Sequence, residues 1–524
     1  MQVNALHAID VYKVGHAEQY PDFTQFVYSN MTPRTSKYAN VIRDAQYGPV
    51  FDERVVVFGI QGFIKETLIE NWNRSFFSRP KEEVLNKYRR RISNIVNREI
   101  SVQRIADLHD LGYLPLRIKA LPEGSLCDIR VPFMTITNTD DRFAWLVNYI
   151  ETMMSANVWK AITIATIAWQ FRKLFMSYAV KTGVDPSMRS LLVSIQGHDF
   201  SARGHGSVED AARNCPGHLL SFMGSDTIAA VDFVEDYYGK DVTDENLALV
   251  ASSVPATEHS VMCMGGDGGE IETIRHLIQD VYPDGIVSVV SDTWDFWRVI
   301  NEFAVELKDI ILNRKPDSRG LAKVVFRPDS GDPVKIICGD PDAPVGSPAH
   351  KGAVECLWDI FGGTVTATGH RVLHERVGLI YGDSITMQRA CAIMAGLEAK
   401  GFSSINLVYG IGSFTYQGVT RDTFGMAVKA TAGVVNGEMR ELFKDPITDD
   451  GNKKSACGLL RVEHENGRFV LYEHQTLDQE KGGALKTVFE NGALMNDQGF
   501  FEIRDRLWAN DEEIIQQEIN SLAA

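Results

Sequence analysis

The stretch VVFRPDSGDP (residues 324–333) places charged side chains directly after an apolar run. Two valines and a phenylalanine are typical of a buried strand, and they lead into Arg327 and Asp329. A guanidinium group binds phosphate oxygens bidentately, and a carboxylate binds hydroxyl groups or a hard cation. The stretch therefore predicts a strand whose end delivers an arginine and an aspartate to an anionic, oxygen-rich ligand.

Seven short apolar runs between residues 191 and 413 end in polar or glycine residues, and helical patterns separate them. The runs are 191–200, 219–226, 249–259, 286–292, 322–329, 376–383 and 405–413. Repeated strand–helix units favour a parallel sheet with helices outside it. We expect an α/β fold with a closed (β/α)8-like barrel rather than an open doubly wound sheet. In such a barrel the polar strand ends converge on one pocket.

The two ends of the chain have a different pattern from the middle. Residues 114–139 and 484–494 show strand and hairpin patterns with proline and glycine turns. We expect residues 1–185 plus 430–524 to form one additional β-rich α+β domain. Residues 186–429 would then form the barrel domain that carries the active site.

Composition excludes some classes of partner. The net charge of −16 argues against non-specific binding of nucleic acid or of an anionic membrane, because both need a basic face. The seven cysteines show no CxxC pair and no Cys/His cluster at zinc spacing, which indicates a reducing compartment. The first residues lack the apolar core of a secretory signal, and the stretch 159–171 is too short to span a bilayer. We expect a cytoplasmic protein.

Glycines at two strand ends add a second feature to the predicted pocket. Gly382 precedes Asp383, and Gly410 and Gly412 lie at the end of the last run. Exposed backbone N–H groups cradle phosphate oxygens, and paired carboxylates suit ribose hydroxyls or Mg²⁺. Together with Arg327, these residues predict a phosphorylated sugar bound with a metal ion.

A histidine and an aromatic residue complete the set of candidates. His259 follows one strand and Asp292 ends the next; a carboxylate that holds one ring nitrogen makes the histidine a better base or nucleophile. Phe200 lies just past another strand, where it could stack on a planar ring, with Arg203 nearby for a phosphate.

Each of these residues alone also fits a structural role. Arg327 could pair with Asp329 or Asp332 as an ion pair, His259 could be a hydrogen-bonded core residue, and Phe200 could serve packing. Seven polar strand ends in series favour the shared pocket instead.

Motifs over nearly the whole chain, in order, carry a family resemblance. They include DVYKVGHAEQYP (10–21), HDFSARG (198–204), SVPATEHS (253–260), VVFRPDSGDP and VYGIGS (408–413). These stretches resemble the nicotinamide phosphoribosyltransferase family of type II phosphoribosyltransferases. The resemblance implies a homodimer that transfers ribose 5-phosphate from phosphoribosyl pyrophosphate to nicotinamide in NAD salvage. The products would be nicotinamide mononucleotide and pyrophosphate.

The resemblance implies roles around the base. Phe200 resembles the residue that stacks on one face of nicotinamide, and Tyr12 of the second subunit resembles its partner on the other face. Asp226 resembles the carboxylate that accepts the carboxamide N–H. Arg203 and Arg327 resemble the ligands of the amide oxygen and of the ribose or phosphate.

The resemblance also implies roles around the sugar, pyrophosphate and ATP. Asp329 resembles the carboxylate on the ribose-hydroxyl or metal side, and Mg²⁺ is expected to be held mainly through pyrophosphate. His259 resembles the histidine that ATP phosphorylates in this family, with Asp292 orienting it. Ribose and its 5′-phosphate would be held by Gly382, Asp383, Gly410, Gly412 and Ser413, the last standing where the family more often has glycine. The basic residues near pyrophosphate, some supplied across the dimer, would be Arg34, Arg421, Lys429 and Lys444.

Three other functions remain open at this point. A nicotinate phosphoribosyltransferase would share the barrel, but the charge of Asp226 would repel a carboxylate substrate. A barrel glycosidase using paired carboxylates would need neither the glycines nor the basic cluster. A nucleotide-sensing or protein-binding module is disfavoured because His259, Arg327, Asp329 and Asp226 are all present.

Overall fold

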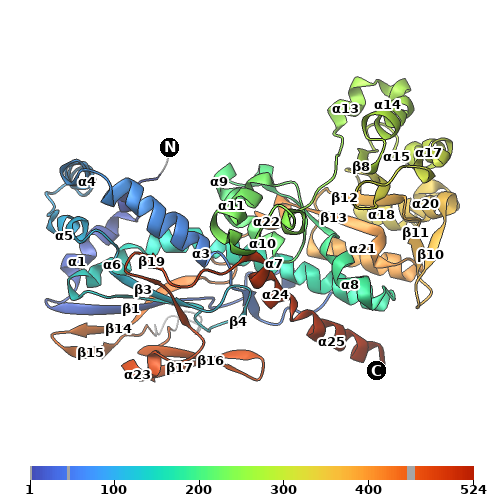
Figure 1. Ribbon diagram of the computed structural model, residues 1–524. Coiled ribbons are helices and arrows are strands. Elements are labelled where there is room, and N and C mark those ends of the chain that lie inside the picture. The colour runs from blue at the N-terminus through green and yellow to red at the C-terminus, as the bar shows by residue number, and fades with distance from the viewer. Residues whose placement is uncertain (1–2, 44–47, 445–454, 524) are drawn as a thin grey trace.

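A computed structural model describes residues 3–43, 48–444 and 455–523 of the 524-residue chain. Figure 1 shows two lobes side by side, one built on an antiparallel sheet and the other on a parallel sheet, with the long helix α7 (Glu151–Lys181) running between them. One continuous hydrophobic core extends through both lobes. The lobes are therefore packed together and not joined by an open linker.

The first lobe contains a seven-stranded antiparallel sheet made from both ends of the chain. Its order is β15 (Glu438–Glu441), β14 (Ala427–Val435), β1 (Thr24–Thr32), β5 (Met134–Asn138), β3 (Leu116–Ala120), β18 (Lys486–Glu490) and β19 (Ala493–Leu494). Strand β14 crosses the predicted domain boundary at 429/430. The division into domains stays a prediction.

Smaller elements surround this sheet. Two further antiparallel pairs are β2 (Arg54–Val56) with β4 (Leu126–Asp128), which are distant in the chain, and the hairpin of β16 (Leu459–Glu465) with β17 (Arg468–Gln475). The helices are α1 (His16–Gln19), α2 (Asn40–Arg43), α3 (Ile60–Gly62), which continues as π-helical turns over Phe63–Asn71 and Asn73–Phe77, α4 (Lys81–Val96), α5 (Gln103–Leu111) and α6 (Ala144–Tyr149).

Helix α7 is the element shared by both lobes. It is buried on all sides from Ala161 to Val180, and most of these residues are apolar, as expected for a helix in the core. It packs on β2 in the first lobe and on α10 (Pro216–Leu219) in the second. The fully buried Arg172 donates from Nε to Asp511 at 3.0 Å, which satisfies its charge inside the core.

The second lobe contains a six-stranded, fully parallel sheet. Its order is β7 (Gly224–Ser225), β6 (Gly197–Phe200), β13 (Leu407–Gly412), β12 (Val377–Tyr381), β9 (Ala322–Arg327) and β8 (Gly285–Val290). Single bridges join Ser252 to Gly224 on one edge strand and Ala256 to Ser288 on the other. The sheet is thus curled, with residues 252–256 touching both of its edges.

The expected eight-stranded barrel is not confirmed, and three predicted strands are wrong in extent. Residues 191–194 belong to α8 (Pro186–Ser194), because Asp185 caps its first turn and Pro186 occupies the first helical position. The run 219–226 forms only the two-residue strand β7, and 249–259 forms only isolated bridges. Apolar composition alone did not distinguish these segments from true strands.

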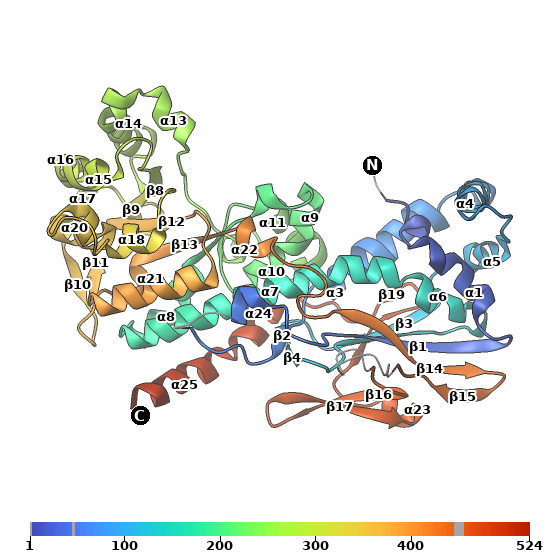
Figure 2. The same ribbon diagram turned by 180° about the vertical axis from the view of Figure 1, so that it is seen from behind.

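Helices cover the outer face of the parallel sheet (Figure 2). Helices lie between the strands of this sheet, as the helical patterns between the apolar runs predicted. The helices are α9 (Val208–Asn214), α11 (Ile228–Tyr238), α12 (Leu247–Val250), α13 (His259–Met264), α14 (Glu270–His276), α15 (Phe296–Arg298), α16 (Ala304–Glu306), α17 (Lys308–Leu312), α18 (Pro333–Cys338), α19 (Pro348–Lys351), α20 (Ala353–Phe361), α21 (Met387–Ala399) and α22 (Ser413–Tyr416). Leu277–Val281 and Val299–Phe303 continue α14 and α15 as π-helical turns, and β10 (Gly363–Val365) pairs with β11 (Arg371–Leu373) outside the sheet.

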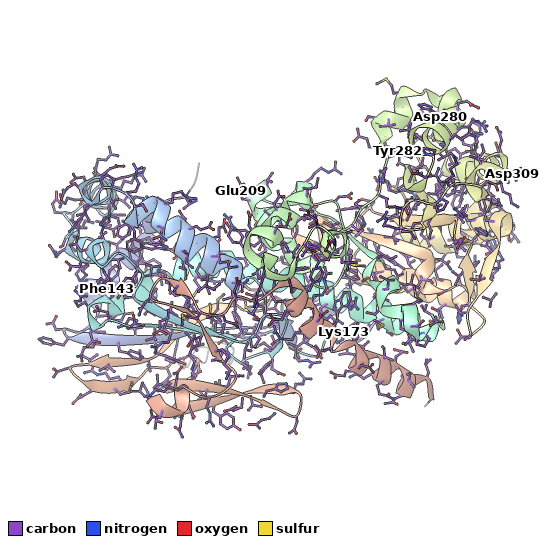
Figure 3. The ribbon with its side chains drawn as sticks, viewed as in Figure 1. Phe143, Lys173, Glu209, Asp280, Tyr282 and Asp309 are labelled. Carbon is purple, nitrogen blue, oxygen red and sulfur yellow. The ribbon has the colours of Figure 1, made fainter. Side chains whose placement is uncertain are left out.

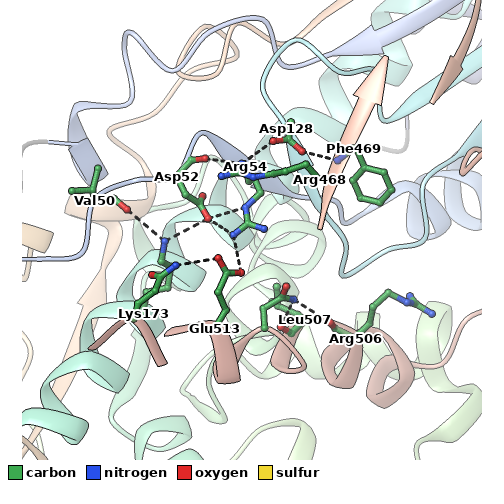
Figure 4. A network of polar contacts seen from close by, with 12 residues as sticks. Val50, Asp52, Arg54, Asp128, Lys173, Arg468, Phe469, Arg506, Leu507 and Glu513 are labelled. Atoms are coloured by element: carbon green, nitrogen blue, oxygen red, sulfur yellow. Dashed lines mark hydrogen bonds and ion pairs between the residues drawn. The ribbon is translucent and has the colours of Figure 1, made fainter. Parts of the chain in front are cut away.

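The C-terminal helices α24 (Phe500–Trp508) and α25 (Asp511–Ala523) lie at the junction of the two lobes. Figure 4 shows the polar network at this junction: Arg54 donates to Asp52 at 2.8 Å and lies 3.5 Å from Glu513 of α25. Lys173 of α7 lies 3.6 Å from Asp52, and Figure 3 shows it between the lobes. Arg54 and Lys173 are buried in this network, whereas Glu513 of α25 is half-exposed, so the buried part of the network connects Asp52 and Arg54 with α7.

In the described part of the chain, no helix is long and apolar enough to cross a membrane.

Candidate active site

Phe200 lies across the carboxyl ends of two neighbouring strands. Strand β13 pairs with β6, so that Gly412 lies opposite Phe200. A Cβ atom on Gly410 would come within 2.4 Å of the Phe200 ring, and one on Gly382 within 2.8 Å. Glycine at both positions therefore leaves the space that the ring occupies.

Replacing Gly410 with alanine should disturb this ring directly. The new Cβ would lie 2.4 Å from Phe200 and 2.7 Å from the Cα of Gly382, so the ring has to move. We expect a loss of about 1–3 kcal/mol in the free energy of unfolding, as for an overpacked core, and a higher KM for the aromatic substrate. Thermal unfolding and substrate kinetics measure the two effects.

Gly412→Ala is the matched control for stability, because a Cβ there meets no atom within 4 Å. An unchanged melting temperature and KM in Gly410→Ala would show that the Phe200 ring is not held by these glycines.

Asp226 lies at the end of β7 beside a histidine and a serine. The Nε2 of His198 lies 2.9 Å from Asp226 Oδ1, and Ser253 Oγ donates to the same oxygen at 2.6 Å. Burial raises the pKa of Asp226, but the hydrogen bond and charge of His198, with help from Ser253 and Arg327, lower it below its ordinary value. Asp226 is therefore a carboxylate at neutral pH, with half of its side-chain surface exposed.

Arg327 ends β9 and its guanidinium is only partly satisfied. Nη2 donates to the carbonyl of Thr257 at 2.6 Å, while Nε is buried and has no hydrogen-bond partner among the described residues. Among the same residues Arg327 forms no ion pair with Asp329 or Asp332. The alternative that Arg327 is only one half of a structural ion pair is therefore not observed. A guanidinium group at the end of a strand suits an oxygen ligand supplied by a substrate.

Asp292 connects the ends of β8 and β9. Its Oδ2 accepts hydrogen bonds from the backbone N–H of Asp329 at 2.9 Å and from Ser330 Oγ at 2.5 Å. Its Oδ1 lies 3.2 Å from Nε2 of His259, the first residue of α13. The Asp292 side chain is 6% exposed, whereas that of His259 is 47% exposed. The carboxylate thus holds a histidine whose ring faces solvent.

Several carboxylates share this strand end. Burial raises the pKa of Asp329, Asp292 and Asp383 raise it further, and Arg327 and His259 oppose them. A carboxyl group crowded by others is stabilised as a carboxylate by a cation. Hard oxygen ligands of this kind suit Mg²⁺, so the residues present fit a magnesium ion held next to Asp329.

The remaining predicted barrel residues lie at the same edge. Arg203 is exposed in a 3₁₀ turn (Ala202–Gly204) directly after β6. A Cβ on Gly204 would come within 2.1 Å of Ser413, so this turn packs against the start of α22. Asp383 is exposed and accepts a 3.0 Å hydrogen bond from Ser384 Oγ.

The four predicted basic residues gather in the other lobe, on the antiparallel sheet. Lys429 of β14 and Arg34 line a cavity of about 200 Å³ together with Arg130. Burial lowers the pKa of Lys429; one nearby acidic group opposes this, and Arg34, Lys444 and Arg421 lower it further. The four cations therefore form one positive cluster, which is suited to a polyanion.

This cluster and Tyr12 lie away from the residues at the carboxyl ends of the parallel strands in the same chain. Figure 1 shows β14 and α1, which follows Tyr12, in the left lobe, and β8 and α13 in the right lobe. Figure 2, which also labels β9, gives the same separation from behind. The Tyr12 side chain is 60% exposed. The predicted site residues thus form two groups, one in each lobe.

Sequence reasoning missed two residues that lie with Phe200 and Asp226 at the ends of the parallel strands. His198 lies two positions before Phe200, and alternation along a strand puts both side chains on one face. Their ring centroids are 5.0 Å apart. The two-residue spacing could have identified His198 from the sequence. Ser253 lies in an irregular segment, where no sequence pattern indicated its position.

Comparison with known proteins identifies the family. A family model described as "Nicotinate phosphoribosyltransferase (NAPRTase) family" matches residues 195–493. The chain is 58% identical over 507 residues to a nicotinamide phosphoribosyltransferase of Acinetobacter baylyi, covering 97% of each. The chain belongs to the NAPRTase family. The prediction of a phosphoribosyltransferase is thereby confirmed at the level of the family.

More distant NAPRTase relatives extend the likeness. A nicotinamide phosphoribosyltransferase of Xanthomonas campestris is 31% identical, with 96% of this chain and 97% of that protein covered. A crystal structure of a nicotinate-nucleotide pyrophosphorylase from Pyrococcus furiosus superposes with a TM-score of 0.56 at 14% identity, covering 98% of this chain and 96% of that one. The latter likeness concerns the fold alone.

Proposed function

We propose that the protein transfers ribose 5-phosphate from phosphoribosyl pyrophosphate to nicotinamide, giving nicotinamide mononucleotide and pyrophosphate for NAD salvage. The observation that carries this proposal is the ionised Asp226 near Phe200 and Arg327. A carboxylate accepts a hydrogen bond from a carboxamide N–H, whereas it repels the carboxylate of nicotinate. The names of the full-length relatives support the same choice of base.

The residues have distinct tasks in this reaction. The lone pair of the nicotinamide ring nitrogen forms a bond to the anomeric carbon while the bond from that carbon to pyrophosphate breaks. Phe200 and Asp226 orient the base, so that its nitrogen faces the carbon without a strong general base. Arg327 binds ribose or phosphate oxygens through its guanidinium group, which the carbonyl of Thr257 anchors. Backbone N–H groups at Gly382, Gly410, Gly412 and Ser413 surround the 5′-phosphate.

The departing pyrophosphate carries most of the developing negative charge. Mg²⁺, held mainly through pyrophosphate with Asp329 as a candidate protein ligand, would supply charge neutralisation there. Arg34, Arg421, Lys429 and Lys444 supply positive charge from the protein.

The active site is proposed to be completed in a homodimer. Tyr12 and the basic cluster lie in the lobe opposite to Phe200 and Arg327, so one chain does not bring them together. A two-fold related copy would place the first lobe of each subunit against the second lobe of the other. Tyr12 would then cover the second face of nicotinamide.

His259 is proposed to couple ATP hydrolysis to this reaction. Asp292 faces Nε2, which leaves the lone pair on Nδ1 to attack the γ-phosphorus of ATP. The bond from that phosphorus to the ADP oxygen breaks, ADP leaves, and water later hydrolyses the phosphohistidine to inorganic phosphate.

His259→Ala should abolish stimulation by ATP while leaving basal transfer. The exposed ring is the proposed phosphoryl acceptor, and positioning of the base does not depend on it. Initial rates with and without ATP, together with labelling from γ-phosphate-labelled ATP, measure this. Full stimulation or full labelling in the variant would rule out the phosphohistidine.

Pyrophosphate release tests the reaction class. We expect release only when phosphoribosyl pyrophosphate, Mg²⁺ and a pyridine base are all present. Release that does not depend on the base would indicate hydrolysis and contradict transfer.

A further inference from the structure

We propose that Glu441, Cys457 and His474 form a binding site for a zinc ion on the outer edge of the antiparallel lobe. The Nδ1 atom of His474 lies 2.9 Å from both carboxylate oxygens of Glu441. The Sγ of Cys457 lies 3.8 Å from Glu441 Oε2, and one ligand atom of each residue lies within 4.8 Å of the others. Three different ligand types thus meet at one point.

These separations fit one ion among the three atoms. Zinc binds sulfur at about 2.3 Å and nitrogen or oxygen at about 2.0–2.2 Å in tetrahedral geometry, so its ligand atoms lie roughly 3.3–3.7 Å apart. The observed separations, from 2.9 Å to at most 4.8 Å, bracket that range. Glu441 is 46% and His474 61% exposed, so the side chains have freedom to adjust and an ion has access from solvent.

The backbone holds the three residues together from separate strands. Glu441 ends β15, Cys457 precedes β16 and His474 lies in β17. The N–H of His474 donates to the carbonyl of Cys457 at 3.3 Å, which fixes these two positions side by side. A Cβ on Gly458 would come within 2.6 Å of Glu441 Oε1, so glycine there leaves room for the carboxylate.

A hydrogen bond to the backbone of Cys457 also holds this residue in place. Glu473 accepts a hydrogen bond from the backbone N–H of Cys457 at 2.7 Å, which fixes the cysteine next to the hairpin. Outer partners of this kind orient the ligands of metal sites.

The donor set selects the kind of ion. A thiolate and an imidazole with one carboxylate suit Zn²⁺, whereas Mg²⁺ prefers oxygen ligands alone. Three protein ligands leave a fourth position for water. The site is distinct from the proposed magnesium position, because that position lies at the carboxyl ends of the parallel strands in the other lobe.

The site borders the basic cavity described above. Ser455, Ala456 and Glu473 line that cavity together with Arg34 and Lys429. A bound ion would join β15 to the β16–β17 hairpin through Cys457, directly after these lining residues. We expect the bound ion to hold in place the part of the cavity lining that Ser455, Ala456 and Glu473 form.

Metal content of the full-length, untagged protein tests the proposal. After loading with zinc chloride and dialysis, mass spectrometry of the metals should find one zinc ion per chain. Cys457→Ser and His474→Ala should each weaken zinc binding by at least about tenfold, the least that loss of a ligand should cost. Cobalt in place of zinc should give a thiolate-to-cobalt absorption band that Cys457→Ser abolishes.

Two controls separate this site from other thiols and imidazoles. Cys263→Ser removes the exposed cysteine of the described chain, and His464→Ala removes a histidine of β16; both variants should keep the zinc. If Glu441 and His474 were only an ion pair, Cys457→Ser would bind zinc as the parent does. That result, or a parent protein that retains no zinc and shows no cobalt band, would overturn the proposal.

Discussion

Asp226→Asn should reduce the preference for nicotinamide over nicotinate by about 100-fold in kcat/KM. The carboxylate of Asp226 is ionised because His198 and Ser253 both hydrogen-bond to its Oδ1. A like-charged substrate placed against it costs several kcal/mol, and each 1.4 kcal/mol is worth a factor of about ten. Asparagine keeps the shape and removes the charge, so the rate with nicotinate should rise. Competition between the two bases measures the ratio.

Ser253→Ala is the matched control for this prediction. It removes one hydrogen bond to Asp226 Oδ1 but keeps the negative charge and the His198 contact. Its selectivity should therefore stay close to that of the parent protein. Unchanged selectivity in Asp226→Asn would remove Asp226 from recognition of the base, because the charge would then have no effect on the choice.

Arg327→Ala should lower kcat/KM by about 100- to 1,000-fold, the usual loss when one charge-stabilising donor of an active site is removed. The guanidinium is anchored to the carbonyl of Thr257, and its buried Nε lacks a partner among the described residues. Its removal also leaves Asp329 among like charges. Steady-state kinetics with phosphoribosyl pyrophosphate as the varied substrate measure the loss, with circular dichroism to show that the variant is folded.

A mixture of variants tests the shared site as well. Lys429→Ala removes a member of the basic cluster in the opposite lobe and should also be poorly active. If each site takes one residue from each subunit, mixed dimers of Arg327→Ala and Lys429→Ala contain one intact site and one doubly damaged site. Subunits mixed at random should recover about a quarter of parental activity. No recovery from demonstrated mixed dimers would contradict a shared site.

The sequence predicted the second lobe well where strand and helix signals agreed. Strands β9, β12 and β13 lie within predicted runs, and β8 begins one residue before its run; the four strands are neighbours in the order β13, β12, β9 and β8. The prediction of a strand failed at residues 191–194, because the capped start of helix α8 outweighed an apolar run that also fits a strand. It failed at 249–259 because this segment makes only single bridges, which no periodicity reveals.

The candidate site was predictable in part, for a related physical reason. Residues at ends of neighbouring parallel strands converge, so Phe200, Asp226, Arg327 and Asp329 could be grouped from the sequence. Ser253 could not be grouped with them, because it lies in an irregular segment. The cluster of Glu441, Cys457 and His474 could not be predicted either, because antiparallel pairing of strands that are distant in the chain brings these residues together.

The most direct test of the account is the identity of the product by mass. The purified protein would be incubated with phosphoribosyl pyrophosphate, Mg²⁺ and equal amounts of nicotinamide and nicotinate, with and without ATP. Nicotinamide mononucleotide as the main product is the predicted result, because Asp226 selects the uncharged amide. Nicotinate mononucleotide as the main product, or neither nucleotide from folded protein, would contradict it.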